Sequence, residues 1–164
     1  NADPFAVPQN QDQKPVSLFG ARDATDLNWV QLLNAYSCTE CGRCSSVCPA
    51  NQTGKELSPR KIMMDTRDRI EEIGRLKENN TNYLLGNYIS KEELWACTTC
   101  NACTDACPIN LDPLSIIVDL RRYLVMEESA APTELNNMFS NVENNGAPWQ
   151  FPAADRLNWI EENK

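Results

Sequence analysis

Two stretches of the chain have the hydrophobic spacing of long amphipathic helices. The first begins at Ser58-Pro59, because serine caps helices well and proline suits their first position. It should run to about Lys77, with Asp65–Arg69 and Glu71–Arg75 spaced as favourable i,i+4 pairs. The residues expected on its buried stripe are Ile62, Met63, Thr66, Ile70, Ile73 and Leu76.

The second stretch begins at Asp112-Pro113 and should run to about Glu128. The residues expected on its buried face are Leu114, Ile117, Val118, Leu120 and Leu124. Both stretches start with a capping residue followed by proline, so their first residues are the best defined boundaries in the chain.

Shorter helices are expected elsewhere. One, capped by Thr25 or Asp26, should run through Trp29, Leu32 and Leu33, and another should start at a capping box, Ser90 with Glu93. Two more are expected near the end, from Pro132 or Thr133 to about Asn144 and from Pro152 or Ala153 onward. No segment alternates apolar and polar residues convincingly, so we predict an all-α fold.

The expected helices and the local composition divide the chain into three parts. Residues 1–23 are rich in Pro, Gln and Asn and are expected to form an extended N-terminal arm, with residues 1–2 a candidate cloning remnant. Residues 24–129 are expected to form the helical domain. Residues 130–164 are expected to form an acidic helical extension.

Composition narrows the chemistry. The 164 residues include 8 Cys and no His, and the formal charge is −8. An acidic chain does not suit nucleic acid, which needs a basic face. Without histidine the commonest general base is missing, and no catalytic residue or substrate site is visible, so whether the chain is an enzyme stays open.

All eight cysteines lie in two runs of identical spacing. Each run is Cys-x₂-Cys-x₂-Cys-x₃-Cys-Pro. The members are Cys38, Cys41, Cys44 and Cys48 in the first run, and Cys97, Cys100, Cys103 and Cys107 in the second. Gly42 and Asn101 follow the second cysteine of each run, and these residue types tolerate a left-handed backbone, so we expect positive φ at both.

The runs resemble the ligand run of bacterial-type [4Fe–4S] ferredoxins. In that family the fourth cysteine of each run ligates the other cluster. The resemblance implies two clusters. Cluster A would take Cys38, Cys41, Cys44 and Cys107, and cluster B would take Cys97, Cys100, Cys103 and Cys48. Structural zinc sites in an interaction domain are the alternative of a different class, and disulfides are a weaker one because no secretion signal is visible.

The flanking residues resemble a narrower group, the helical dicluster ferredoxin domain of heterodisulfide-reductase-type Fe–S oxidoreductases that carry a cysteine-rich catalytic domain. The succinate dehydrogenase and fumarate reductase iron–sulfur subunits have a related fold in their C-terminal half. The matching stretches are CTECGRCSSVCPA (38–50), LSPRKIMMDTRD (57–68), LWACTTCNACTDACPI (94–109), RRYLVMEE (121–128) and ENNGAPW (143–149). The resemblance covers roughly residues 17–160.

This resemblance implies an electron-transfer module with two [4Fe-4S] clusters that connects a redox partner to a catalytic module. A subunit of a succinate or fumarate reductase-like complex fits less well, because four further cysteines expected near the N-terminus are missing. The implied partners are redox proteins or subunits, among them a cysteine-rich catalytic module and a membrane-anchored segment. No apolar run is long enough to span a bilayer, so the expected location is cytoplasmic, at the inner face of the membrane only through such a partner or segment.

Overall fold

The computed structural model describes residues 19–76 and 81–162. The regular elements of these residues are helices, and the only strand-like pairing among them is an isolated bridge between Leu85 and Ile89. The all-α prediction is confirmed. Most of the N-terminal arm expected at residues 1–23 lies outside the described residues.

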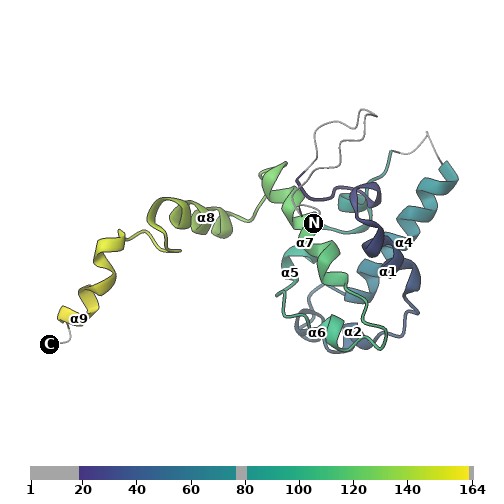
Figure 1. The fold of residues 1–164 in the computed structure, drawn as a ribbon, viewed down its shortest axis with the longest axis horizontal. Helices are drawn as coiled ribbons and strands as arrows, with labels where there is room; N and C mark the ends of the chain where they lie inside the picture. The colour runs from purple at the N-terminus through teal and green to yellow at the C-terminus, as the bar shows by residue number, and fades with distance from the viewer. Residues whose placement is uncertain (1–18, 77–80, 163–164) are drawn as a thin grey trace, which may run out of the picture. The chain divides into compact units, whose positions relative to one another are not determined.

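The described chain divides into two compact units, one up to Tyr123 and one from Leu124 onward. The first unit holds both cysteine runs, and the second holds the C-terminal helices (Figure 1). The three-part division expected from the sequence stays a prediction.

The first unit is built from helices of very different length. The two long ones are α4 (Pro59–Leu76) and α7 (Pro113–Met126), of which α7 runs across the unit boundary. The short ones are η1 (Ala24–Asp26), α1 (Trp29–Ser37), α2 (Arg43–Ser46), α3 (Pro49–Gln52), η3 (Leu84–Tyr88), α5 (Lys91–Ala96) and α6 (Ala102–Asp105).

Local sequence signals set most helix starts. Lys61 donates its backbone N–H to Ser58 Oγ at 3.4 Å, and Ser115 donates its N–H to Asp112 Oδ1 at 3.1 Å. The capping box of Ser90 and Glu93 starts α5 as predicted. The predicted cap of α1 is wrong: Asn28 caps it in a box with Gln31, while Asp26 closes a separate box with Asp23 around η1.

The core of the first unit lies where α4 packs against α1, η1 and η3. The predicted stripe of α4 is buried at Ile62, Met63 and Thr66, but Leu76 is exposed. Arg69, expected to pair with Asp65, is buried, with 1% of its surface exposed. On α7, Val118 was expected inside and is exposed, while Ile116 and Tyr123 are buried.

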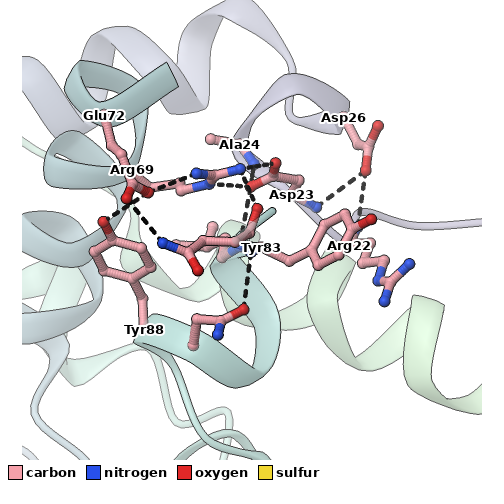
Figure 2. Close-up of polar contacts among 11 residues, drawn as sticks. Arg22, Asp23, Ala24, Asp26, Arg69, Glu72, Tyr83 and Tyr88 are labelled. Atoms are coloured by element: carbon pink, nitrogen blue, oxygen red, sulfur yellow. Dashed lines mark hydrogen bonds and ion pairs between the residues drawn. The ribbon is translucent and has the colours of Figure 1, made fainter. Parts of the chain in front are cut away.

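Buried Arg69 is the centre of a polar network that joins three elements (Figure 2). Its guanidinium donates to both carboxylate oxygens of Asp23, at 2.7 and 2.6 Å, and to Glu72 at 2.6 Å. Tyr88 donates its hydroxyl to the same Glu72 oxygen at 2.9 Å, and the backbone N–H of Leu84 donates to Asp23 at 2.9 Å. The network therefore ties the segment before η1 to α4 and to η3.

The second unit contains α8 (Thr133–Asn145), η4 (Ala153–Leu157) and α9 (Asn158–Glu162). Helix α8 agrees with its prediction and ends at Gly146, which has the left-handed φ of 63° common after helix ends. The last expected helix is divided, with a 3₁₀ turn before α9.

Candidate metal centre

The two cysteine runs enter the structure in the same way. Helices α1 and α5 are each started by a capping box and end one residue before the first cysteine of a run. Cys38 and Cys97 then cap these helices, each donating its N–H to the carbonyl three residues earlier. Each run therefore starts from a fixed helix end.

The backbone of the two runs also repeats. Gly42 and Asn101 have φ of 80° and 64°, which confirms the expected left-handed positions. A second matched pair, Glu40 and Thr99, has φ of 58° and 56°. Sequence reasoning missed this pair because neither residue type favours the left-handed region. Left-handed residues next to right-handed turns make concavities of backbone N–H groups that bind anions and Fe–S clusters.

The third cysteine of each run lies on a one-turn helix, Cys44 on α2 and Cys103 on α6. These two helices contact each other and lie side by side at one end of the unit (Figure 1). The next residue, Ser45 or Thr104, hydrogen-bonds the cap of the following long helix, Ser58 at 2.7 Å and Asp112 at 3.4 Å. Each long helix is thereby connected to the loop of its own run.

Five cysteines from both runs line one cavity beside these helices. Of these five, Cys38, Cys41 and Cys44 belong to the first run, and Cys103 and Cys107 belong to the second. Most of the remaining wall is apolar, with Met63, Ile109, Leu111, Pro108 and Pro113. The lining includes all four residues that the ferredoxin resemblance groups as cluster A, together with Cys103 of the other set.

The members of the second predicted set differ in burial. Cys48 is buried, Cys97 and Cys103 are half-buried, and Cys100 is exposed. Beside them, the indole Nε1 of Trp95 is buried and has no hydrogen-bond partner within the described part of the chain. An orphaned donor two residues from Cys97 fits a site whose acceptor is a cluster sulfur.

The donor set suits cubane clusters. In residues 19–76 and 81–162, no three Cys, Asp or Glu side chains are close enough to hold a single metal ion. A [4Fe–4S] cluster does not require such convergence, because each thiolate binds a different iron at the rim of the core. Thiols spaced around a mostly apolar cavity therefore fit a cluster.

The thiols must lose their protons to bind iron. Burial raises the pKa of Cys103 to about 11 and also raises the pKa of Cys44. The backbone N–H of Ala102 is the main cause of a lowered pKa at exposed Cys100. Metal binding by the buried thiols therefore releases protons near neutral pH.

Comparison with known proteins agrees with this chemistry. Residues 37–111 match the family described as a 4Fe-4S dicluster domain. The chain is 32% identical over 179 residues to the probable iron-sulfur-binding oxidoreductase FadF of Bacillus subtilis, covering 88% of this chain and 25% of that protein. It is also 32% identical over 169 residues to the EtfAB:quinone oxidoreductase of Syntrophomonas wolfei, covering 88% of this chain and 24% of that protein.

A shorter relative is one of the subunits of the ferredoxin/F(420)H(2)-dependent CoB-CoM heterodisulfide reductase of Methanosarcina acetivorans. It is 34% identical over 101 residues, covering 61% of this chain and 52% of that relative. The chain thus spans about a quarter of the first two relatives. Within the described helices, none is long and apolar enough to cross a bilayer.

Proposed function

Because the chain belongs to the iron–sulfur electron-transfer proteins with a 4Fe-4S dicluster domain, homologous to FadF-like oxidoreductases and heterodisulfide reductase subunits, we propose that it connects a redox partner to a catalytic module. Each [4Fe-4S] cluster supplies a one-electron step. The chain supplies the thiolate ligands, the positions of the clusters and the exclusion of water. The observation that carries the proposal is the cavity lined by cysteines of both runs.

The proposed ligand sets are crossed. Cluster A takes Cys38, Cys41, Cys44 and Cys107, and cluster B takes Cys97, Cys100, Cys103 and Cys48. The shared cavity supports the first set, since Cys107 lines it with all three early cysteines of the first run, whereas Cys103 is the only member of the second set that lines it. The contact between α2 and α6 supports the exchange of fourth ligands, because these helices carry the third cysteine of each run.

The walls of the cavity have a role in this function. Met63 is buried on α4, and Leu111 is buried ahead of α7. Apolar groups around a cluster control solvent access, which is one determinant of reduction potential. The long helices therefore shield the cluster as well as supporting its loops.

Iron and sulfide content test the proposal. We expect anaerobically purified protein to contain about eight irons and eight acid-labile sulfides, because each of the two clusters holds four of each. Dithionite should bleach its visible absorbance and produce the electron paramagnetic resonance (EPR) signal of reduced clusters. Stoichiometric zinc without sulfide would instead establish the structural zinc-binding alternative.

The acidic C-terminal residues suggest how a partner approaches. Residues 123–164 hold seven acidic and two basic side chains, so more than half of the formal charge of −8 lies there. We propose that these residues face a basic redox partner and that the cysteine-run region faces the catalytic module. Such attraction guides association and is screened by salt.

Salt dependence tests the proposed approach. Between about 0.1 M and 1 M salt the Debye length falls from about 10 Å to 3 Å, so reduction by a cationic donor such as reduced methyl viologen should slow. Reduction by anionic dithionite should accelerate. Exchanging exposed Glu134, Glu143 and Glu161 for Gln should weaken both trends.

The matched control exchanges three exposed glutamates of the first unit, Glu56, Glu71 and Glu92, for Gln. An equal effect of the two triple variants would mean that only net charge matters and that the C-terminal residues have no special role.

The proposed place of action is the cytoplasmic side of a membrane, reached through a partner. The quinone in the name of one relative supports a membrane acceptor. Fractionation of the native cells checks this, because the chain should sediment with membranes and be released when the partner is removed.

A further inference from the structure

The two long helices place an arginine at the same position. Arg67 is the ninth residue of α4, counted from Pro59, and Arg121 is the ninth residue of α7, counted from Pro113. Each side chain returns to the cysteine loop that precedes its own helix. Arg67 bonds Glu40 inside the first loop, and Arg121 bonds the carbonyls of Leu94 and Cys97 at the entry to the second.

The charge around these two arginines differs. Arg67 Nη2 lies 2.6 Å from Glu40 Oε1, and its Nε lies 3.6 Å from Asp68, so carboxylates balance its charge. In the second run the position that matches Glu40 is occupied by Thr99, which has no charge. The hydrogen bonds of Arg121 to the described residues all go to carbonyls, with Nε 3.0 Å from Leu94 O and Nη2 2.5 Å from Cys97 O.

Arg121 also packs against an aromatic ring and is partly out of water. Its guanidinium lies over the ring of Trp95, 4.9 Å from the centroid. Burial lowers the pKa of Arg121, and the Cys97 thiolate opposes this effect. A partly buried cation without a carboxylate is costly unless another anion lies nearby. The nearby anion available in the holoprotein is the cluster, whose four thiolates around a +2 core leave about −2.

We propose that Arg121 is the countercharge of the cluster held by Cys97, Cys100 and Cys103, and that it raises the reduction potential of this cluster selectively. The proposal rests on the proposed function, since it requires a cluster at this site. Reduction transfers one electron from an external donor to the cluster and makes it more negative by one unit. A fixed cation favours that reduced form, because the attraction grows with the added charge.

Arg121 is a positioning residue rather than a ligand. Its bonds to Leu94 and Cys97 hold the end of α5 and the start of the cysteine loop. The first loop has no equivalent net charge from Arg67, because Glu40 cancels it. The exposed Arg43 and Arg60 line the cavity of the first run but lie in water, which screens them.

Redox titration followed by EPR tests this. Arg121→Met should lower the midpoint potential of one cluster and leave the other unchanged. Arg121→Lys, which keeps the charge, should stay close to the parent. The neighbouring control Arg122→Met removes an exposed arginine paired with Asp119 and should move neither midpoint. The double variant Glu40→Gln/Arg67→Met removes the matched pair without changing net charge and should also leave both midpoints in place.

The outcomes separate this inference from the proposed function. Parent protein without about eight irons would overturn the proposed function. Full iron content with unchanged midpoints in Arg121→Met, or equal shifts in Arg121→Met and Arg122→Met, would overturn the inference alone. If Arg121→Met fails to retain iron, the Arg121→Lys variant tests the inference instead. A lowered midpoint potential in Arg121→Lys would contradict a charge effect, because this variant keeps the positive charge. To identify the cluster whose midpoint potential changes, the titration is repeated in a Cys41→Ala background. In that background only the cluster of the second run should remain.

Discussion

Replacing Cys107 with alanine is expected to remove the cluster of the first run and to leave the cluster of the second. Cys107 belongs to the second run in sequence, but it lines the cavity formed by Cys38, Cys41 and Cys44. Loss of one of four thiolates opens one iron to solvent and exchange. Iron should therefore fall from about eight to about four per chain.

Thiol alkylation under anaerobic conditions, followed by mass mapping, would show which cluster is lost. In Cys107→Ala, the thiols of Cys38, Cys41 and Cys44 should become reactive, while those of the second set stay protected. The second loop should also loosen, because metal binding and folding are coupled, and hydrogen exchange across α6 would detect this.

The matched control is Cys48→Ala, which should give the reverse result. In this variant the thiols of Cys97, Cys100 and Cys103 should become reactive, while the thiols of the first set stay protected. Protection of the first set in Cys107→Ala together with exposure of the second would mean that each run holds its own cluster, and the crossed assignment would be wrong.

The site could be anticipated only in part. Spacing alone identifies all eight candidate ligands, since sequence-adjacent cysteines must share a loop. The assignment of the fourth cysteine of each run to a cluster depends on how α2 approaches α6 in the tertiary structure. From the sequence, this assignment came only from a family resemblance. The contacts of Arg67 and Arg121 with the loops could not be predicted, because an arginine on an amphipathic helix is usually a solvated residue.

The fold shows the same division between local and long-range effects. Helix starts at Pro59, Lys91 and Pro113 follow from capping residues within a few positions and were predicted. The five-residue turn η3 was missed because it has no periodic apolar pattern, and Gly86 inside it has φ of 97°. It is held by long-range bonds, such as that from the N–H of Leu84 to Asp23.

Arg69 is the clearest failure of local reasoning. The sequence offers Asp65 as an i,i+4 partner, and a surface pair is the ordinary expectation. In the structure Asp65 pairs with Lys61 at 3.2 Å, and Arg69 turns inward to Asp23 and Glu72. Asp23 lies 46 residues earlier, so only the tertiary fold makes burial of Arg69 tolerable.

The network around Arg69 has little dependence on pH near neutrality. Burial alone would raise the pKa of Asp23, but hydrogen bonds from Arg69 and from two backbone N–H groups hold it below its ordinary value. The pKa of Glu72 is also lowered, chiefly by bonds from Asn82 and Arg69. A lowered folded-state pKa of an acid stabilises the fold above the ordinary value of about 4 and is lost only as the pH falls below it. The contribution should therefore be constant between pH 6 and 8.

Exchanging Arg69 for methionine is expected to destabilise the first unit by about 3–5 kcal/mol, because it leaves the buried carboxylate of Asp23 without its cation. For a chain of this size, the apparent melting temperature of the anaerobic holoprotein should fall by about 10 °C. Arg75→Met, the same exchange at an exposed position of α4, should change the melting temperature little.

The double variant Asp23→Asn/Arg69→Met should recover part of the loss of stability, since the unpaired charge is then removed as well. The network would be contradicted if the stability losses of the two single exchanges simply added in the double variant. It would also be contradicted if Arg69→Met had the melting temperature of the parent. Either result would mean that Arg69 and Asp23 do not depend on each other for burial.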